Sequence, residues 1–416
     1  MGNNRAGNKR LAIVGGGAAG FFCAVNAAEQ HPDLDIVLLE KSSRFLSKVA
    51  VSGGGRCNVT QACSSISEML KAYPRGSRFL KKAFYQFFTN DTVDWFQRHG
   101  VTLKTEPDGR MFPITNTSET VMQCLLHQAR DLGVQLLQNK AVQNLKRAGD
   151  AFEIVLKDDG IIPADYVCIA CGGLPKLSQY DLFKDLALSV VPPVPSLFTF
   201  NLPQHPIRAL MGVSVPETEI KLVQSQSKLK TTGPLLITHW GLSGPVVLKL
   251  SAVAARLAAE KNYRLGIQVN WLPEYNEEHL RQMLIQYRQQ HGAAKVAGKN
   301  PFGLPARLWQ FFMTCAEIAD VTHWADLPAK AQNRLTKILC AHEMTVSGKT
   351  TFKEEFVTAG GISLDEIDPQ TMMCKKHPGL FFAGEILDID GITGGYNFQN
   401  AWTTGFIAAK NIKSPR

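Results

Sequence analysis

Near the start of the chain, the pattern of hydrophobic and polar positions changes from one typical of a strand to one typical of a helix, and then back to that of a strand. Residues 10–40 read RLAIVGGGAAGFFCAVNAAEQHPDLDIVLLE: a short apolar run, a glycine turn, an alanine-rich segment and a second apolar run. Short apolar runs next to turn residues are typical of buried strands, and the segment between them has the length and composition of a helix. The pattern predicts a βαβ unit.

Further strands are predicted beyond residue 150. AFEIVLKDDG alternates apolar and polar residues, and DYVCIACGG is a continuous apolar run that ends in glycines. Continuous apolar runs are typical of parallel strands buried on both faces. The sequence therefore predicts an α/β domain built on a parallel sheet.

The composition changes after Gly173. No glycine occurs until Gly212, and strand patterns with turns continue to about residue 270. Helical patterns follow, and strands and glycines return from about residue 341. We predict a discontinuous first domain with two inserted parts: residues 1–191 and 341–416 for the first domain, 192–274 for a β-rich insert, and 275–340 for a helical subdomain.

The overall composition narrows the class of protein. Of the 416 residues, 45% are hydrophobic and 19% are charged, which fits a chain of several globular domains. The longest apolar runs are too short for a membrane span or contain lysine or arginine, and the basic N-terminus lacks the apolar core of a signal peptide. These patterns predict a cytoplasmic protein without a membrane partner, and they leave the oligomeric state open.

Charge and cysteine content add two expectations. The net charge of +9 permits a polyanionic partner such as RNA, because lysine and arginine displace counterions from phosphates. Cys168 and Cys171 form the only close pair among nine cysteines, and they lie within an apolar strand pattern. This position favours buried thiols, and we predict no metal site.

A nucleotide-binding motif lies in the predicted βαβ unit. Gly15, Gly17 and Gly20 form GxGxxG between strand and helix, and Glu40 ends the next strand 20 residues later. In this context the glycines permit a tight turn, a close approach of pyrophosphate and close helix packing. The carboxylate can accept the ribose hydroxyls of an adenosine. The motif predicts a bound dinucleotide.

The end of the chain favours FAD over NAD. GLFFAGEILDIDG, at residues 379–391, is a strand that ends at Gly384 with Glu385 behind it. A carboxylate in a late return of the chain can bind the ribityl hydroxyls of FAD. GGYNFQNAW then starts a helix whose amides could face the N1 and O2 edge of the flavin and stabilise negative charge there.

The stretch VSGGGRCNVT, at residues 51–60, has three possible roles: a phosphate cradle, a wall against a flavin ring, or a flexible turn. Its position after Glu40 favours a place along FAD, where glycines let the backbone lie close to a flat ligand. Arg56 could pair with a negative charge and lower the pKa of Cys57. Cys57, Tyr396 and His239 are candidate proton donors, with a core thiol and a turn histidine as the alternative interpretations.

These motifs, together with THWGLSGP and TAGGI, resemble those of the BaiN/RdsA family of NAD(P)/FAD-dependent oxidoreductases over nearly the whole chain. The resemblance implies an α/β fold with a discontinuous, Rossmann-like FAD/NAD(P)-binding domain, interrupted by a β-barrel-like insert with a helical subdomain. It implies that the backbone near Val142 meets the adenine. The implied cofactor-binding residues are Gly15, Gly17, Ala18, Gly20, Glu40, Lys41, Gly54, Arg56, Val142, Gly384, Glu385, Gly395, Tyr396 and Asn397.

One loop departs from the family pattern. Many relatives follow an ATGG strand end with a serine, a proline and a glycine-rich GSxGDGY loop, whereas this chain reads ACGGLPKLSQYDLF. The contribution of the glycine-rich loop to cofactor or substrate binding is therefore open. Lys176 in the replacement loop is either a phosphate contact or a solvated lysine.

The resemblance implies a reduction or oxidation at a flavin, and three functions follow from it. The first is reduction of a uridine in large-subunit ribosomal RNA to dihydrouridine, with a hydride added to C6 and a proton to C5. The second is oxidation or reduction of a small metabolite, an amine or an enone. The third, for which the missing glycine-rich loop is the only support, is a non-catalytic flavoprotein or an RNA-binding assembly factor. Because no second GxGxxG occurs, NAD(P)H would dock transiently as the electron donor.

Overall fold

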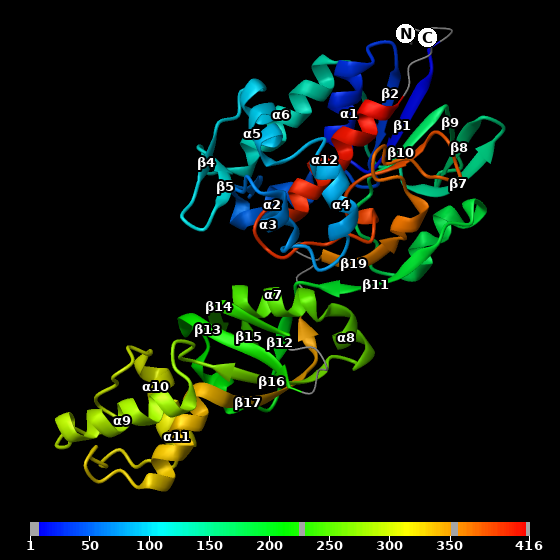
Figure 1. Cartoon of the computed structure of the whole chain (residues 1–416). Coiled ribbons are helices and arrows are strands. Elements are labelled where there is room, and N and C mark those ends of the chain that lie inside the picture. Colours follow the sequence, from blue (N-terminus) through cyan, green and yellow to red (C-terminus); the bar gives the residue numbers. More distant parts are fainter. Residues whose placement is uncertain (1–7, 224–228, 351–356, 413–416) are drawn as a thin grey trace. The chain divides into compact units, whose positions relative to one another are not determined.

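A computed structural model describes residues 8–223, 229–350 and 357–412 (Figure 1). The chain forms two compact units: unit 1 contains Met1–Pro195 and Lys353–Arg416, and unit 2 contains Ser196–Phe352. Residues 1–7, most of the basic N-terminal segment, lie outside the described residues. Strands β17 (His342–Ser347) and β18 (Lys349–Thr350) follow residue 341, where the composition of the sequence changes, and they belong to unit 2. The finer division into four segments stays a prediction.

Unit 1 is built on a five-stranded parallel sheet of order β20-β10-β1-β2-β6. Most residues of the three central strands are buried, as expected of strands covered on both faces. The parallel α/β fold predicted from the continuous apolar runs is confirmed. The strands are β1 (Arg10–Val14), β2 (Asp35–Leu39), β6 (Gln135–Leu137), β10 (Tyr166–Ile169) and β20 (Leu380–Phe382).

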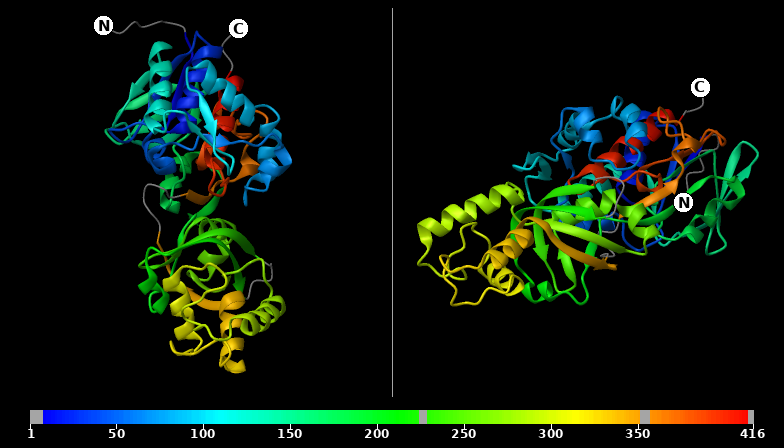
Figure 2. Two further views of the ribbon diagram at one scale, coloured as in Figure 1. Left: turned by 90° about the vertical axis from the view of Figure 1, so that its left-hand side faces the viewer. Right: turned by 60° about the horizontal axis from the view of Figure 1, so that its bottom comes forward.

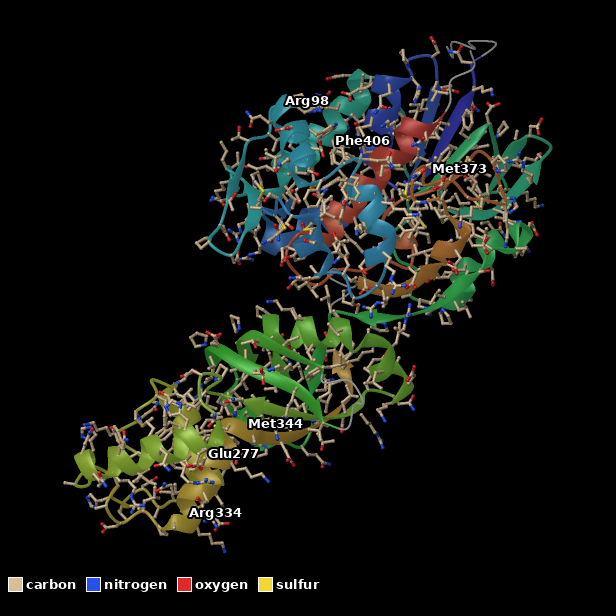
Figure 3. All side chains as sticks on the ribbon, in the orientation of Figure 1. Arg98, Glu277, Arg334, Met344, Met373 and Phe406 are labelled. Atoms are coloured by element: carbon tan, nitrogen blue, oxygen red, sulfur yellow. The ribbon has the colours of Figure 1, made fainter. Side chains whose placement is uncertain are left out.

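Helices α1 (Ala18–Gln30) and α12 (Tyr396–Asn411) pack side by side in unit 1, although they come from opposite ends of the chain (Figure 2). Aromatic side chains pack around them: the ring centroids of Phe22 in α1 and Trp402 in α12 lie 5.1 Å apart, and Phe406 stacks on Phe87 at 4.4 Å between ring centroids. Phe406 of α12 is labelled in Figure 3. This packing fixes the starts of both helices relative to the sheet.

Smaller elements surround the parallel sheet. Two antiparallel sheets have the orders β3-β5-β4 and β7-β8-β9, and β11 pairs with β19. The strands are β3 (Thr60–Gln61), β4 (Leu103–Thr105), β5 (Arg110–Pro113), β7 (Val142–Ala148), β8 (Ala151–Leu156), β9 (Ile161–Ala164), β11 (Val190–Ser196) and β19 (Val357–Ile362). The helices are α2 (Ser47–Gly55), α3 (Ile66–Leu70), α4 (Ser77–Phe84), α5 (Thr89–Arg98), α6 (Ser118–Asp131) and the 3₁₀ segments η1 (Leu177–Leu186), η3 (Leu364–Glu366) and η4 (Gly384–Ile386).

Unit 2 contains an antiparallel sheet of order β17-β16-β13-β14-β15-β12-β18. Three helices cover the segment that has helical patterns in the sequence: α9 (Glu277–His291), α10 (Ala306–Cys315) and α11 (Ala329–Ala341). The remaining elements are β12 (Thr199–Asn201), η2 (Pro206–Leu210), β13 (Ser214–Val223), β14 (Lys230–Ile237), β15 (Gly241–Ser243), α7 (Pro245–Val253), α8 (Ala255–Glu260) and β16 (Arg264–Asn270). Across the described ranges, no helix has both the length and the apolar character that crossing a membrane requires.

Candidate functional site

The carboxyl ends of the parallel strands meet along one edge of the sheet in unit 1. Backbone hydrogen bonds align them: the Gly15 amide donates to the Leu39 carbonyl at 2.8 Å, and the Ala383 amide donates to the Ile169 carbonyl at 2.9 Å. The glycine turn, Glu40, the Cys171 turn and Gly384 therefore lie along the same edge. In open parallel sheets this edge is where ligands bind.

The three glycines of the turn differ in their surroundings. Gly15 has a φ of +117° and a Cβ there would lie 2.4 Å from the Ala170 carbonyl oxygen, while a Cβ on Gly20 would lie 1.9 Å from the Gly15 carbonyl oxygen. Both positions require glycine for close packing. Gly17 caps α1, and a Cβ there would meet no atom within 4 Å. Open space thus lies beside Gly17 at the start of α1, where the free amides of a first helical turn favour an anion such as a pyrophosphate.

Glu40 is held beside this turn. Its Oε2 accepts a hydrogen bond from the Gly16 amide at 2.9 Å, and its Oε1 accepts from the Ser42 amide and hydroxyl at 2.8 Å each. The Lys140 amide donates to the Glu40 carbonyl at 2.8 Å, which brings the start of β7 at Val142 close to the same end. Lys41 is exposed. The geometry suits an adenosine at this end of the edge.

Glu385 follows β20 and lies farther along the same edge of the sheet. Gly384 has a φ of +75° and its amide donates to the Thr404 hydroxyl at 2.8 Å. One Glu385 oxygen accepts from the Thr358 amide at 3.0 Å, and the other pairs with Lys48 at 2.9 Å. A Cβ on Gly173 would lie 2.7 Å from the first oxygen, so this glycine leaves the carboxylate its place.

Two hydroxyl groups near Glu385 have no hydrogen-bond partner in the described part of the chain. The Thr358 hydroxyl and the Tyr180 hydroxyl are both buried and unsatisfied. Burial raises the pKa of Tyr180, and Cys171 and Glu385 act on it in the same direction. Because buried polar groups normally have partners, these hydroxyls fit a polar ligand along this edge, such as the ribityl and pyrophosphate of FAD.

Sequence reasoning missed Tyr180, Thr358 and Lys48. Tyr180 lies in the loop that replaces the glycine-rich GSxGDGY of relatives, which was the signal that could have found it. Thr358 belongs to the TAGGI motif but carries no pattern of its own. Lys48 reaches Glu385 across 337 positions of sequence, a separation that no local pattern indicates.

The GGYN segment forms the start of α12. Gly395 caps the helix with a φ of +90°, and a Cβ there would lie 2.7 Å from the Thr60 backbone. Asn397 uses both side-chain groups on Gly391: it accepts from the amide at 2.8 Å and donates to the carbonyl at 2.9 Å. Asn397 therefore holds the loop before the helix. Burial raises the pKa of the half-buried Tyr396, whose hydroxyl stays protonated at neutral pH.

The SGGG segment is an exposed left-handed turn at the end of α2. Gly53, Gly54 and Gly55 have φ values of 58°, 68° and 81°, and all three are exposed. A Cβ on Gly54 or Gly55 would meet nothing within 4 Å, whereas one on Gly53 would lie 3.0 Å from the Phe112 ring. The turn thus leaves bare backbone exposed on one side and packs on Phe112 on the other.

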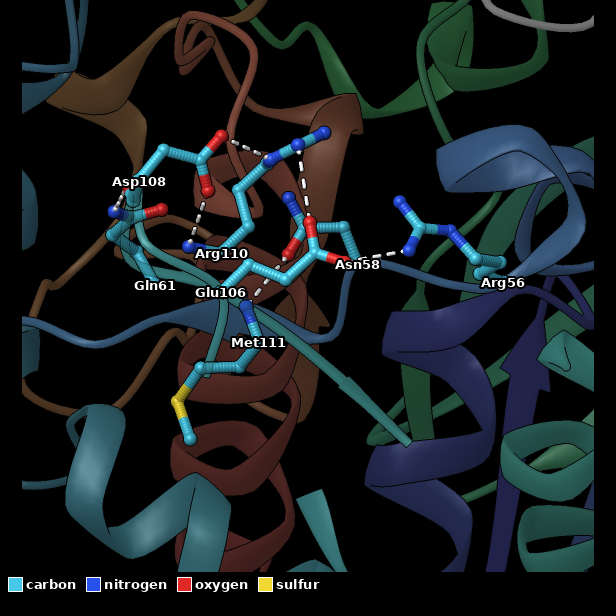
Figure 4. A network of polar contacts seen from close by, with 7 residues as sticks. All are labelled: Arg56, Asn58, Gln61, Glu106, Asp108, Arg110 and Met111. Atoms are coloured by element: carbon cyan, nitrogen blue, oxygen red, sulfur yellow. Dashed lines mark hydrogen bonds and ion pairs between the residues drawn. The ribbon is translucent and has the colours of Figure 1, made fainter. Parts of the chain in front are cut away.

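Arg56 belongs to a polar network that supports this turn (Figure 4). Its Nη1 pairs with Glu106 at 2.6 Å, and its guanidinium lies 4.0 Å from the centroid of the Phe112 ring. Glu106 also pairs with Arg110 at 3.2 Å, and Arg110 pairs with Asp108 at 2.6 Å. The charge of Arg56 is therefore already compensated within the protein, and its contacts anchor the turn.

The structure corrects the expectation for Cys57. The side chain is fully buried in the core, and the residue has a φ of +59°. Burial raises the pKa of the thiol to about 12. The idea that Arg56 lowers this pKa is wrong, because burial dominates and Arg56 is engaged with Glu106. A thiol without exposure also lacks the access to substrate that a proton donor needs.

Three other residues singled out in the sequence are His239, Cys168 and Lys176. His239 is exposed in unit 2, in the turn between β14 and β15, where its carbonyl accepts from Arg208 Nε at 2.6 Å. Cys168 is fully buried in β10, and Lys176 is exposed. Among the residues that the structure describes, no three His, Cys, Asp or Glu side chains are grouped as metal ligands.

A parallel sheet with a GxGxxG turn, an acid directly after the second strand and a second carboxylate after the late strand β20 defines the class of dinucleotide-binding flavoproteins. Comparison with known proteins gives the family. The model described as HI0933-like protein Rossmann domain matches residues 9–411. The chain belongs to this family of FAD-dependent oxidoreductases, as its motifs predict.

Curated relatives match over nearly their whole length. The chain is 27% identical over 407 residues to the 3-dehydro-bile acid delta(4,6)-reductase of Clostridium scindens, covering 96% of this chain and 98% of the relative. It is also 27% identical over 411 residues to the ribosomal RNA dihydrouridine synthase of Escherichia coli, covering 96% and 97%. The enzyme of the same name from Haemophilus influenzae is 27% identical over 417 residues, with the same coverage.

A solved structure supports the fold alone. The 3-ketosteroid-delta4-(5alpha)-dehydrogenase of Rhodococcus jostii aligns with a TM-score of 0.51 and 13% identity, and the alignment covers 98% of each chain. The architecture is thus that of an FAD oxidoreductase with a parallel Rossmann sheet and antiparallel insert sheets.

Proposed function

We propose that the protein reduces a uridine of large-subunit ribosomal RNA to dihydrouridine, with FAD as cofactor and NAD(P)H as electron donor. The observation that carries the proposal is the full-length similarity to two ribosomal RNA dihydrouridine synthases. The net charge of +9 supports it, because an RNA carries one negative charge per nucleotide and binds a basic protein by counterion release.

The residues along the strand edge support FAD as the cofactor. We propose that the pyrophosphate lies at Gly17 and the first amides of α1, and that Glu40 accepts the ribose hydroxyls of the adenosine. Glu385, held by Lys48, would accept the ribityl hydroxyls, and the unsatisfied hydroxyls of Tyr180 and Thr358 would bind the same part. The start of α12 would stabilise negative charge on the ring.

When bound, FAD supplies the hydride that adds to C6 of the uracil, and the protein must deliver a proton to C5. Among the candidate donors, Tyr396 is neither fully buried like Cys57 nor part of unit 2 like His239. It is half-buried at the start of α12, beside the Gly394 and Gly395 backbone, and burial keeps its hydroxyl protonated. We propose Tyr396 as the general acid in place of Cys57.

The proposal is tested with a strain that lacks the protein. Nucleosides from its large-subunit ribosomal RNA are measured by mass spectrometry, alone and after restoring the wild-type protein or the Gly17→Ala variant. We expect dihydrouridine to disappear in the strain and to return with the wild-type protein. Dihydrouridine that is unchanged in the strain overturns the proposal.

The similarity to the bile acid reductase favours a second candidate, reduction of a small enone. By their names, both kinds of relative reduce a carbon–carbon double bond conjugated to a carbonyl group, so the same proton donor serves either substrate. Turnover of a 3-oxo-Δ4 steroid by the purified protein with NADPH, without RNA, would support this candidate. The positive charge of the chain favours RNA over a steroid.

A further inference from the structure

Helix α4 has one buried and one exposed face. Phe79, Leu80, Ala83 and Phe84 are buried. Arg78, Lys81 and Lys82 are exposed, and Tyr85, which caps the helix, is 72% exposed. These four residues are spaced i, i+3, i+4 and i+7, so they form one stripe, which we call the basic face of α4.

The three cations of this face have no ion-pair partner among the described residues. Other cations of the same region do: Lys71 pairs with Glu68 at 2.7 Å, and Arg75 pairs with the buried Asp390. Three cations without an ion pair to any described residue thus lie together on the outward side of α4. A stripe of this kind is suited to a partner that brings its own negative charge.

The basic face begins next to the candidate cofactor edge. A Cβ on Gly76, the cap of α4, would lie 2.6 Å from Ile389, and the Ile392 amide donates to the Ala72 carbonyl at 2.9 Å. The Tyr73 hydroxyl donates to the Tyr396 carbonyl at 2.7 Å. The segment before α4 is thus tied to the loop that leads into α12, and α4 runs beside α12 on the surface of unit 1 (Figure 1).

We propose that the basic face of α4 binds a single-stranded segment of ribosomal RNA next to the target uridine. Arg78, Lys81 and Lys82 contact successive phosphates, and Tyr85 stacks on a base. Cations beside an exposed aromatic ring are the arrangement by which proteins hold unpaired RNA. A protein partner is less suited, since Tyr85 is the sole large apolar side chain on this stripe. The inference rests on the proposed function and names the surface that it uses.

The test measures binding of a fluorescein-labelled, unstructured 20-nucleotide RNA by anisotropy, from 50 to 300 mM KCl. The association constant for RNA decreases with salt, and each phosphate contact on a single strand adds about 0.7 to the steepness of log K against log salt concentration. In the triple variant Arg78→Gln/Lys81→Gln/Lys82→Gln, we expect this steepness to decrease by about 2. At 0.1 M salt this corresponds to binding about 100-fold weaker. Tyr85→Ala weakens binding by about 5- to 150-fold and leaves the slope unchanged.

A matched control removes three exposed lysines at another part of unit 1: Lys146→Gln/Lys157→Gln/Lys184→Gln. All variants are compared at equal FAD content and equal melting temperature. If the wild-type protein binds RNA and the α4 variant binds it equally well, or if the control weakens binding as much, the basic face is not the RNA contact, while the proposed function stands. An α4 variant that binds RNA normally but loses a co-purifying protein would assign the face to that protein and overturn the inference.

Failure of the proposed function has a different signature. In that case dihydrouridine in the ribosomal RNA does not depend on the protein, and the wild-type protein shows no measurable binding to the labelled RNA even at 50 mM KCl. The proposed function and the role of the basic face are both supported if the strain lacking the protein forms less dihydrouridine when it expresses the α4 variant than when it expresses the lysine control.

Discussion

Replacing Gly17 with alanine should weaken FAD binding while the protein still folds. Gly17 has φ and ψ of −97° and −168°, which alanine adopts freely, and the added methyl group meets no protein atom within 4 Å. The loss of glycine at a helix cap costs about 1 kcal/mol at most, or about 2–4 °C in melting temperature. The methyl group would instead occupy the space of the pyrophosphate. Losing one charge-assisted hydrogen bond costs about 1.5–3 kcal/mol, which raises the Kd for FAD by about 10- to 150-fold.

The assay titrates FAD into the protein from which flavin has been removed, follows flavin fluorescence for the Kd, and measures the melting temperature of the same apoprotein. Gly298→Ala is the control, because a Cβ there makes only an ordinary contact, 3.9 Å from the Lys295 carbonyl oxygen. Gly20→Ala is the opposite case: its Cβ would lie 1.9 Å from the Gly15 oxygen, and we expect loss of folded protein. A Gly17→Ala protein with wild-type melting temperature and wild-type FAD affinity would refute the placement of the pyrophosphate.

Three further predictions concern single side chains. Cys57→Ala should retain FAD and turnover, and it should lower the unfolding free energy by about 1 kcal/mol, as measured by urea denaturation. A tenfold loss of turnover at full FAD content would contradict the interpretation of Cys57 as a buried, inert thiol. Tyr396→Phe keeps FAD affinity but slows substrate reduction by about 10²- to 10⁴-fold in stopped flow, and equal slowing of flavin reduction by NADPH would argue against an acid role. Burial lowers the pKa of His342 to about 4, below its unfolded value of about 6.5, so the unfolded chain takes up a proton first as the pH falls. The unfolding free energy of the wild-type protein should therefore drop by about 3 kcal/mol more than that of His342→Gln between pH 6.5 and 4, and equal slopes would contradict this.

The sequence predicts the parallel sheet and the glycine turn because their signals are local. Gly15, Gly17 and Gly20 stand at fixed positions between a strand and a helix, and Glu40 follows at the end of the next strand. The strand before Gly384 is also marked by a continuous apolar run. Each of these features depends on residues close together in the chain, so the period and spacing carry the information.

The support of the site could not be predicted, because it comes from distant residues. Arg56 pairs with Glu106, which is 50 positions away, and Glu385 pairs with Lys48, which is 337 positions away. The polar and glycine neighbours of Cys57 suggest exposure, yet the left-handed backbone at Cys57 turns its side chain into the core. Single residues such as Tyr180 and Thr358 form no pattern, and their role depends on what the fold leaves unsatisfied around them.

The position of β20 and α12 after unit 2 in the sequence has a consequence for synthesis on the ribosome. Unit 2 is translated completely before β20, the edge strand beside β10, and α12, the helix beside α1, leave the exit tunnel. Until then the nascent unit 1 exposes the apolar faces of α1 and β10 and lacks Glu385. Unit 2 can fold first, whereas the strand edge of unit 1 is completed only when β20 and α12 have emerged, so the nascent protein exposes apolar surface and needs protection from aggregation until then.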